Sequence, residues 1–377
     1  MNARDTALLE RAFAEADKAE WLWTAPNPRV GALALCDGHV VGYGSHQRFG
    51  QAHAEEAALQ DAGAIDGDCA IPGRVDEIIV SLEPCSARGG TKKRRPCLEW
   101  IIEAQVKRVV IGATDPDPRH QGASIKQLRA AGVEVICSNA QSRFEQQNPA
   151  FLSALSQSQR PWILLKWAAS LDGRTATAHG VSQWITGSVA REEVHGLRAV
   201  SHGVMAGKRT VAIDNPHLTA RNTTGICNPH LARVLVGALD TVRPGSALLA
   251  DDCPRIWIEG NAKQLPTWAN EADRLVEVGQ VAGGKLNVKE AMSRLKSDFG
   301  IHRLLVEGGA RLHGNLLAAG LADAIVRYEA PLLLGGGLGS ICGDGVEHPR
   351  EGWHLGMEER QNLGDDLRRA FLIQRMP

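Results

Sequence analysis

The chain has 377 residues, with 42 lysines and arginines against 43 acidic residues and a formal net charge of −1 at pH 7. At roughly 100–200 residues per domain, this length predicts two domains, each large enough to bury a core. The near-zero net charge argues against a strongly charged partner such as nucleic acid or an anionic membrane surface. We therefore expect a small-molecule substrate and neither a nucleic-acid nor a membrane partner.

The N-terminal twenty residues place apolar and charged positions at helical spacing, without the uninterrupted apolar run that a signal peptide needs. No stretch approaches the roughly 20 apolar residues that span a bilayer. The eight cysteines are scattered rather than spaced as in a disulfide scaffold. These features predict a soluble, cytoplasmic protein with reduced thiols.

The first 150 residues predict a layered α/β domain. A helix over residues 4–20 is followed by two apolar runs, Val30–Cys36 and His39–Tyr43, which the turn residues Asp37-Gly38 join into a hairpin. Helices are expected near 53–62, 97–104 and 124–131, and strands at 77–82, 108–111 and 133–137. Strands that alternate with helices are typical of this fold class.

A polar, Ser- and Gln-rich segment between Asn148 and Pro161 predicts the domain boundary. We expect a first domain over residues 1–147, a linker over 148–161 and a second domain over 162–377. The second domain is also predicted to be α/β, beginning with the apolar strand Trp162–Ala168. Its further expected elements are a helix near 188–199, strands near 203–206, 233–237, 255–258, 303–306 and 324–328, and a helix ending near residue 319. Almost no motif is recognisable over 222–300.

Four residues of the first domain form a motif with a defined chemistry. His53-Ala54-Glu55 begins a predicted helix, Glu83-Pro84-Cys85 follows a strand about thirty residues later, and Cys97 begins another helix. This order is the signature of zinc-dependent base deaminases, in which the glutamate is not a ligand. Two thiolates and one imidazole leave a fourth zinc position open for water, and helix N-termini favour the thiolate form.

The motif therefore predicts His53, Cys85 and Cys97 as ligands of one Zn2+. Glu55 is expected to take a proton from the attacking water and to return it to the departing ammonia. The alternative is a structural histidine near two core cysteines, which we disfavour because all four residues occur in the expected order. The other six cysteines are expected to be small buried or incidental residues.

The motif and its flanking segments Pro26-Asn27-Pro28-Arg29-Val30-Gly31 and Thr114-Asp115-Pro116-Asp117-Pro118 resemble the deaminase half of the bifunctional riboflavin-biosynthesis deaminase/reductase family. The resemblance implies a cytidine-deaminase-like fold and Asn27 as a contact to the pyrimidine; alternatively, P-N-P is only a rigid turn.

The loop between the two cysteine ligands departs from this family, whose loop is close to C-S-H-H-G-R-T-P-P-C. Residues 86–96 are about three residues longer, which loop-closure entropy tolerates, and they lack both histidines. Lys92, Lys93, Arg94 and Arg95 suggest the hypothesis that this loop meets the 5′-phosphate of the substrate. A solvated charged loop is the alternative.

Segments 166–176, 182–187, 214–221 and 306–309 closely resemble the reductase half of the same family. The resemblance implies a dihydrofolate-reductase-like fold in which NADPH delivers hydride to the sugar C1′, and it places Lys166 at that sugar as the catalytic cation. Implied contacts to the ribose phosphate come from Ser182, Arg198, Leu218, Arg221 and Glu307. Implied contacts to the nicotinamide cofactor come from Ala168, Trp184, Thr210 and Asp214.

Three residues or motifs of the second domain have simpler alternatives to a binding role. Gly308-Gly309 ahead of a helix can offer backbone N–H groups to a pyrophosphate, but two glycines can also form a tight turn. Arg198 could instead pair with Glu192 or Glu193 on its own helix, and Trp184 could be a core residue.

Together, these features predict a hydrolase and oxidoreductase of riboflavin biosynthesis. The first domain would deaminate 2,5-diamino-6-ribosylamino-4(3H)-pyrimidinone 5′-phosphate, and the second would reduce the ribosyl side chain to ribityl with NADPH. We expect a homo-oligomer. One alternative is a catalytically silent, ligand-binding second domain, for which loss of Lys166 or Glu307 would be the signal. The other is a nucleic-acid base deaminase, supported only by the basic run 92–95.

Overall fold

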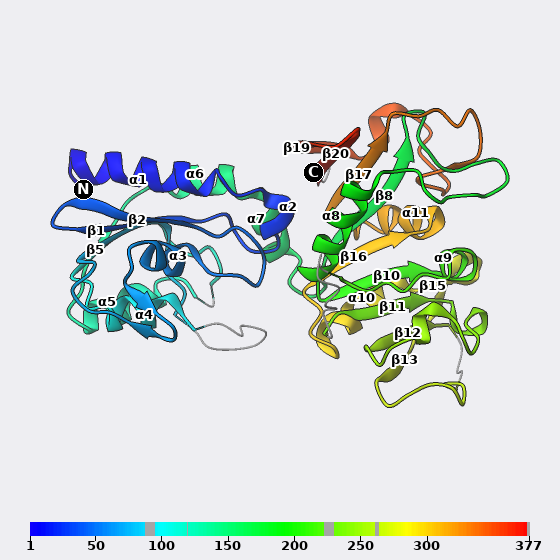
Figure 1. The fold of residues 1–377 in the computed structure, drawn as a ribbon, viewed down its shortest axis with the longest axis horizontal. Helices are drawn as coiled ribbons and strands as arrows, with labels where there is room; N and C mark the ends of the chain where they lie inside the picture. Colours follow the sequence, from blue (N-terminus) through cyan, green and yellow to red (C-terminus); the bar gives the residue numbers. More distant parts are fainter. Residues whose placement is uncertain (87–94, 119, 222–229, 261–263, 375–377) are drawn as a thin grey trace. The chain divides into compact units, whose positions relative to one another are not determined.

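The computed structural model describes residues 1–86, 95–118, 120–221, 230–260 and 264–374. The chain divides into two compact units, Met1–Ser156 and Gln157–Pro377, each with its own sheet (Figure 1). The division falls inside the segment in which the sequence predicts a boundary. Over the described part of the chain, no helix combines the length and the apolar character needed to cross a membrane.

The first unit is built on a five-stranded sheet with the order β2-β1-β5-β6-β7. β1 (Gly31–Cys36) runs antiparallel to both β2 (His39–Ser45) and β5 (Glu77–Leu82). β6 (Arg108–Ala113) and β7 (Glu134–Cys137) continue parallel to β5. The predicted hairpin and strands are confirmed. Every residue of β5 is buried, as expected for the central strand of a sheet covered on both faces.

Helices cover both sides of this sheet. Figure 1 shows α1 and α6 on one side and α3, α4 and α5 on the other. The helices are α1 (Ala3–Ala16), α2 (Trp21–Thr24), α3 (Ala54–Asp61), α4 (Cys97–Glu103), α5 (Ala123–Ala130), α6 (Gln141–Gln147) and α7 (Pro149–Ser156), and a short hairpin pairs β3 (Ile65–Asp66) with β4 (Cys69–Ala70).

Two bare glycines let α3 lie directly on β2. A Cβ at Gly44 would fall 2.1 Å from the Ala54 carbonyl oxygen, and one at Gly42 would fall 2.3 Å from the Ala58 carbonyl oxygen. No side chain fits in either gap, so only glycine allows this close approach. Because α3 begins beside His53, these glycines set the position of the metal motif.

The expected linker 148–161 is not a continuous polar loop, because its first half forms α7 within the first unit. Pro149 occupies the first helical position, where a missing N–H breaks no intrahelical bond. The Asn148 side chain accepts from the Arg29 backbone N–H at 2.6 Å and donates to the Arg29 carbonyl at 3.1 Å. The Ser- and Gln-rich composition concealed a helix that is stabilised by contacts with a distant segment.

The second unit contains a nine-stranded sheet with the order β13-β12-β11-β10-β16-β8-β17-β20-β19. Neighbouring strands are parallel from β13 to β17, and the last two strands form an antiparallel hairpin at one edge. The strands are β8 (Trp162–Ser170), β10 (Gly203–Gly207), β11 (Ala232–Val236), β12 (Arg255–Glu259), β13 (Asp273–Glu277), β16 (Arg303–Gly308), β17 (Ala324–Ala330), β19 (His354–Leu363) and β20 (Asp366–Gln374).

The helices and minor elements of this unit surround the sheet. The helices are α8 (Ser188–Ala199), α9 (Lys208–Asp214), α10 (Val288–Ser297) and α11 (Ala310–Ala318), and the small strand pairs are β9 (Arg174–Ala176) with β18 (Leu338–Gly339) and β14 (Gln280–Val281) with β15 (Lys285–Leu286). The elements expected in this unit are confirmed, including the strands near 233–237 and 255–258, whereas α9, β13, α10, β19 and β20 were missed. A capping signal does precede α10, because the Asn287 side chain accepts from the Glu290 N–H at 3.2 Å.

Candidate active sites

His53, Cys85 and Cys97 converge at one end of the first sheet. His53 precedes the first residue of α3, Cys97 is the first residue of α4, and Cys85 lies three residues after β5. The His53 Nδ1 is 3.5 Å from the Cys85 Sγ and 3.4 Å from the Cys97 Sγ. The backbone N–H of Cys97 donates to the Cys85 Sγ at 3.3 Å, a contact that favours a thiolate.

These separations fit one tetrahedral zinc ion. With Zn–S bonds of about 2.3 Å and Zn–N bonds of about 2.0–2.1 Å, tetrahedral angles place nitrogen and sulfur ligands about 3.6 Å apart. The two N···S distances, 3.4 and 3.5 Å, agree with this value, and all three ligand atoms lie within 4.8 Å of one another. Three protein ligands leave one position open, which is typical of catalytic zinc.

Glu55 lies in the first turn of α3 and is buried. Burial raises the pKa of Glu55 to about 7 and the charge of Cys85 adds to this effect, while His53 and a hydrogen bond with Cys97 oppose it. A carboxyl group with a pKa near neutrality can both take up and release a proton during a reaction. Glu55, the proton carrier predicted from the sequence, therefore lies against the predicted metal ligands.

His46 is a member of this site that the sequence did not reveal. Its ring is 2% exposed and meets the His53 ring edge-on, with 5.3 Å between centroids. The His46 Nδ1 is 2.9 Å from the Ala52 carbonyl, so it carries the proton, and the Nε2 then accepts from the Asn27 amide at 3.3 Å. His46 thus joins the expected pyrimidine contact to the metal site. Its spacing from His53 matches no metal or helical pattern.

Glu83 anchors the loop that carries Cys85. Its buried carboxylate accepts from the Asp115 N–H at 3.2 Å and the Gly122 N–H at 2.9 Å. It also accepts from the Ser124 N–H at 3.1 Å and the Ser124 hydroxyl at 2.9 Å. A carboxylate at the N-terminus of α5 is favourable because the helix leaves N–H groups unpaired there. These bonds tie the 114–118 segment to the strand end beside the metal ligand.

The hypothesis of a phosphate contact by the basic loop falls mostly outside the described residues, since Lys92, Lys93 and Arg94 belong to the segment 87–94. Arg95 is described, and it pairs with Glu99 at 3.2 Å and with Glu103. Its guanidinium also lies 4.3 Å from the centroid of the Trp100 ring. Arg95, two residues before α4, is therefore directed at side chains of that helix rather than at a ligand.

In the second unit, Lys166, Arg198 and Glu307 form one half-buried charge cluster. The Arg198 Nε and Nη2 donate to the two Glu307 carboxylate oxygens at 2.5 and 2.9 Å, and the Lys166 Nζ is 3.7 Å from the Glu307 Oε2. Arg198 also donates to the Thr219 carbonyl at 2.9 Å. The suggested alternative, in which Arg198 pairs with Glu192 or with Glu193, is therefore wrong.

The charges of this cluster shift the pKa values of its members. Burial lowers the pKa of Lys166, and Glu307 partly opposes that shift. Burial by itself would raise the pKa of Glu307, but the neighbouring Arg198 and Lys166 hold it at about 2. One carboxylate between two cations leaves a net positive charge, which suits a phosphate or a developing negative charge on oxygen.

Three of the expected cofactor residues, Gly308, Gly309 and Thr210, lie at or just after the carboxyl ends of parallel strands, where ligands bind in open α/β sheets. Gly308 ends β16 and Thr210 lies in α9, which follows the neighbouring strand β10. A Cβ on Gly308 or Gly309 would lie 2.9 or 3.1 Å from the Thr210 hydroxyl oxygen. Gly309 directly precedes α11, so this bare backbone ahead of a helix fits a pyrophosphate. Asp214 accepts from the Ser182 hydroxyl at 3.0 Å.

The remaining expected residues have varied surroundings. Ala168 pairs with Tyr328 in the sheet, and Leu218 is buried with a φ of +52°. Arg221 is exposed, and its backbone N–H donates to the His195 Nδ1 at 3.3 Å. Trp184 is 69% exposed with the Arg191 guanidinium 4.6 Å from its ring centroid, so the alternative that it is a core residue is wrong.

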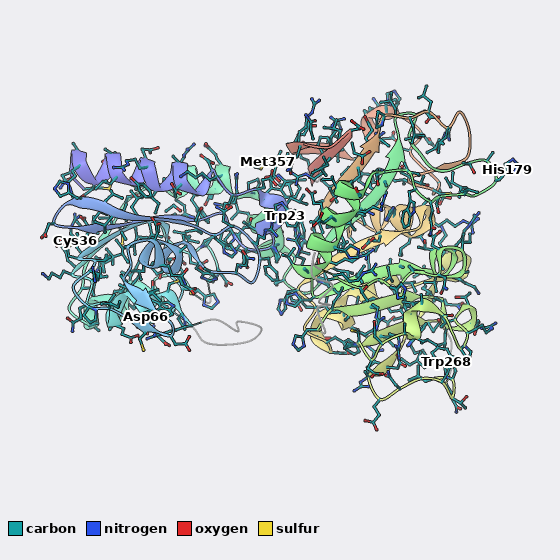
Figure 2. The ribbon with its side chains drawn as sticks, in the orientation of Figure 1. Trp23, Cys36, Asp66, His179, Trp268 and Met357 are labelled. Atoms are coloured by element: carbon teal, nitrogen blue, oxygen red, sulfur yellow. The ribbon has the colours of Figure 1, made fainter. Side chains whose placement is uncertain are left out.

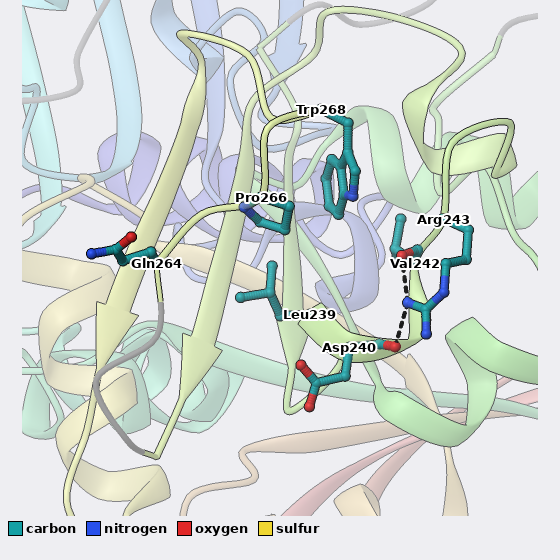
Figure 3. Close-up of a pocket in the computed structure, with 7 residues that line it drawn as sticks. All are labelled: Leu239, Asp240, Val242, Arg243, Gln264, Pro266 and Trp268. Atoms are coloured by element: carbon teal, nitrogen blue, oxygen red, sulfur yellow. Dashed lines mark hydrogen bonds between the residues drawn. The ribbon is translucent and has the colours of Figure 1, made fainter.

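A cavity of about 520 Å3 lies elsewhere in the second unit. Its wall includes Trp268, on the β12–β13 side of the sheet (Figure 2). Figure 3 shows the lining residues Leu239, Asp240, Val242, Arg243, Gln264, Pro266 and Trp268. Arg243 donates to the Asp240 and Val242 carbonyls at 2.5 and 2.9 Å, so its charge is directed at its own turn. None of the expected active-site residues lines this cavity.

The His-Cys-Cys cluster with its buried glutamate defines the first unit as a zinc-dependent deaminase domain. Residues 2–113 match the family model described as "Cytidine and deoxycytidylate deaminase zinc-binding region". Residues 161–367, more than half of the chain, match the model described as "RibD C-terminal domain". The chain belongs to the RibD family of bifunctional deaminase/reductases of riboflavin biosynthesis.

Individual relatives agree with this family over nearly the whole chain. The chain is 35% identical over 347 residues to the riboflavin biosynthesis protein RibD of Aquifex aeolicus, covering 92% of each chain. It is 34% identical over 375 residues to RibD of Escherichia coli, covering 97% of this chain and 98% of the relative. The solved structure of Acinetobacter baumannii RibD, form 1, is similar with a TM-score of 0.71 at 29% identity and 99% coverage of both chains.

A solved Thermotoga maritima structure is named as a diaminohydroxyphosphoribosylaminopyrimidine deaminase/5-amino-6-(5-phosphoribosylamino)uracil reductase. It matches with a TM-score of 0.65 at 28% identity, covering 98% of this chain and 99% of that one. The predictions of fold class, bifunctional enzyme activity, a zinc-binding deaminase domain and an NADPH-using reductase domain are confirmed by family membership. Lys166 and Glu307, whose loss would signal a silent second domain, are both present.

Proposed function

We propose that this chain performs two consecutive steps on one pyrimidine ribose phosphate, with the residue roles given below. The observation that carries the proposal is the triangle of His53, Cys85 and Cys97 with the buried Glu55 against it. The first step would replace the amino group at one pyrimidine carbon with oxygen, and the second would reduce the ribosyl side chain to ribityl.

In the deamination, zinc held by the three ligands supplies Lewis acidity that activates water. Glu55 removes a proton from the attacking water and delivers it to the amino nitrogen, which leaves as ammonia. Asn27, held by its contact with the buried His46, hydrogen-bonds the pyrimidine. Its role is to orient the ring so that the amino-bearing carbon faces the water.

In the reduction, bound NADPH supplies hydride to the sugar C1′. The Lys166 ammonium would give a proton to the sugar oxygen as the C1′–O bond opens, and Glu307 would hold that ammonium in place. Contacts to the ribose phosphate are proposed for Ser182, Arg198, Leu218, Arg221 and Glu307. Contacts to the cofactor are proposed for Ala168, Trp184, Thr210, Asp214, Gly308 and Gly309.

Supporting observations extend the proposal to partners and location. The seven cysteines in the described ranges are not joined in disulfides, as a reducing cytoplasm would maintain. The net charge of −1 supports a small substrate rather than nucleic acid. A homo-oligomeric state remains a proposal, which sedimentation of the purified chain would test.

One assay with the diaminopyrimidine ribose phosphate tests both steps. We expect ammonia release without cofactor, and ribityl product only when NADPH is added. Glu55→Gln should abolish ammonia release but still reduce a deaminated substrate. Lys166→Met should release ammonia but fail to reduce the deaminated substrate. Absence of ammonia with the unaltered zinc-loaded chain would overturn the proposal. Tight RNA or DNA binding that weakens steeply with salt would support a nucleic-acid deaminase instead.

A further inference from the structure

Tyr328 lies beside Lys166 but belongs to none of the segments that resemble the family. It is 1% exposed on β17, and the Lys166 Nζ is 5.7 Å from its ring centroid. The parallel register pairs Lys166 with Val326 and Ala168 with Tyr328. Lys166 and Tyr328 therefore project from the same face of neighbouring strands, and the distance is within the range of a cation–π contact.

The hydroxyl end of Tyr328 is held by the half-buried Glu193, which the buried Arg368 holds in turn. It donates to the Glu193 Oε1 at 3.0 Å, and the Arg368 Nη1 donates to the same oxygen at 3.3 Å. Arg368 is fully buried and lies opposite Tyr328 in the β17–β20 pairing. A fully buried ring with a fixed hydroxyl has little freedom to rotate, so it forms a rigid wall.

Helix α8 connects this wall to the charge cluster. Arg198 on α8 reaches Glu307 on β16, and Glu193 on the same helix reaches Tyr328 on β17. The sheet order β16-β8-β17 places the strand of Lys166 between these two anchors. One helix thus holds the groups on both sides of the ammonium.

We propose that Tyr328 is a positioning residue for Lys166 in the reductase reaction, with Glu193 and Arg368 holding its ring in place. This inference rests on the proposed role of Lys166. A lysine side chain has four flexible carbons, and the Glu307 carboxylate lies 3.7 Å from the ammonium. The Tyr328 ring supplies the opposing surface, which limits where the proton is presented.

The same arrangement makes the pH dependence of the reduction informative. The charged or titratable groups around Lys166 are Glu307 on β16, Arg198 on α8, Tyr328 on β17 and His313 on α11. Burial raises the pKa of Tyr328 well above its usual value, so the ring stays neutral while Lys166 titrates. Removal of the ring would destabilise the ammonium, and reduction would then be lost at a lower pH on the alkaline side.

Four variants of the full-length, zinc-loaded chain test the proposal, with a thermal unfolding curve of each as the check that its second unit remains folded. Tyr328→Leu removes the ring, and Tyr328→Phe keeps the ring but removes the hydroxyl. Ile325→Ala is a matched control that shortens a buried side chain on the opposite face of β17. Lys166→Met tests the proposed function itself. Reduction of the deaminated substrate with NADPH is measured from pH 6 to 10.

We expect Tyr328→Leu to lower kcat by about 100-fold, the loss typical of a reacting group misplaced by about 1 Å, with little change in KM. The alkaline limb of its pH–rate profile for reduction should move to lower pH. Tyr328→Phe should lose less than about tenfold and keep the original limb, and Ile325→Ala should retain kcat despite a lower melting temperature. If Lys166→Met is inactive but Tyr328→Leu keeps the original kcat and pH profile, or if Ile325→Ala loses as much, the inference is refuted. An active Lys166→Met would refute the proposed role of Lys166 instead.

Discussion

Gly44→Ala is expected to disable the deaminase through a single added methyl group. The Cβ of the alanine would lie 2.1 Å from the Ala54 carbonyl oxygen and 2.3 Å from the Ala58 nitrogen. Both contacts are with the backbone of α3, which cannot move aside as a flexible side chain would. Either α3 or β2 must therefore shift.

The size of that shift follows from the contact distance. Real Cβ atoms essentially never approach closer than 3.0 Å, so the two elements must separate by at least about 0.9 Å. β2 is an edge strand and can take part of this movement. If α3 makes half of this movement, His53 and Glu55 are displaced by about 0.5 Å. A displacement of about 0.5 Å is the limit within which a catalytic site keeps its productive geometry. Overpacking should also cost about 1–3 kcal/mol of stability.

Zinc content and two activities measure the result. We expect Gly44→Ala to bind less zinc by elemental analysis and to release ammonia about 10- to 100-fold more slowly, since 1 Å of misplacement costs about 100-fold. Reduction of a deaminated substrate belongs to the second unit and should be unchanged. Gly336→Ala is the matched control, because a Cβ there meets nothing within 4 Å. Full zinc content with ammonia release within threefold of the unaltered chain would refute the reasoning.

Three further perturbations have defined outcomes. Chelation of zinc should abolish ammonia release and leave NADPH oxidation intact, and added Zn2+ but not Mg2+ should restore ammonia release. Deamination that continues without the metal would contradict this prediction. Glu307→Gln leaves the half-buried Arg198 without its carboxylate and should cost up to about 3–5 kcal/mol in denaturant unfolding. Because the pKa of Glu307 falls from 4.5 to about 2 on folding, its stabilisation is present above pH 4.5 and is lost as pH falls towards 2. The variant should therefore lose less stability than the original chain over that interval, and equal acid sensitivity would argue against the shift. Asp323→Asn breaks a buried pair with Arg160, whose Nη1 and Nη2 lie 2.6 and 2.7 Å from the carboxylate, and a similar loss is expected; unchanged unfolding would show that the pair adds nothing.

Sequence reasoning succeeded where a structure depends on neighbouring residues. The hairpin of Val30–Cys36 and His39–Tyr43 follows from alternation around a turn, and β1 and β2 form as predicted. It failed where distant contacts override composition. α7 forms in a Ser- and Gln-rich stretch because Asn148 bonds to the Arg29 backbone. The C-terminal hairpin of β19 and β20 was missed, although β20 alternates buried and half-buried positions.

The zinc motif was predictable by itself, because the order of its residues and their places at helix starts are local properties of the chain. The partners of the charged side chains were not. Arg198 and Glu307 are 109 positions apart, and Tyr328 and Glu193 are 135 apart. A hydrophobic pattern indicates which face of a strand is buried, but not which strand lies beside it. The strand order β16-β8-β17 places Lys166 between a carboxylate and an aromatic ring. The close packing of α3 on the glycines of β2 determines where the predicted zinc ligands meet.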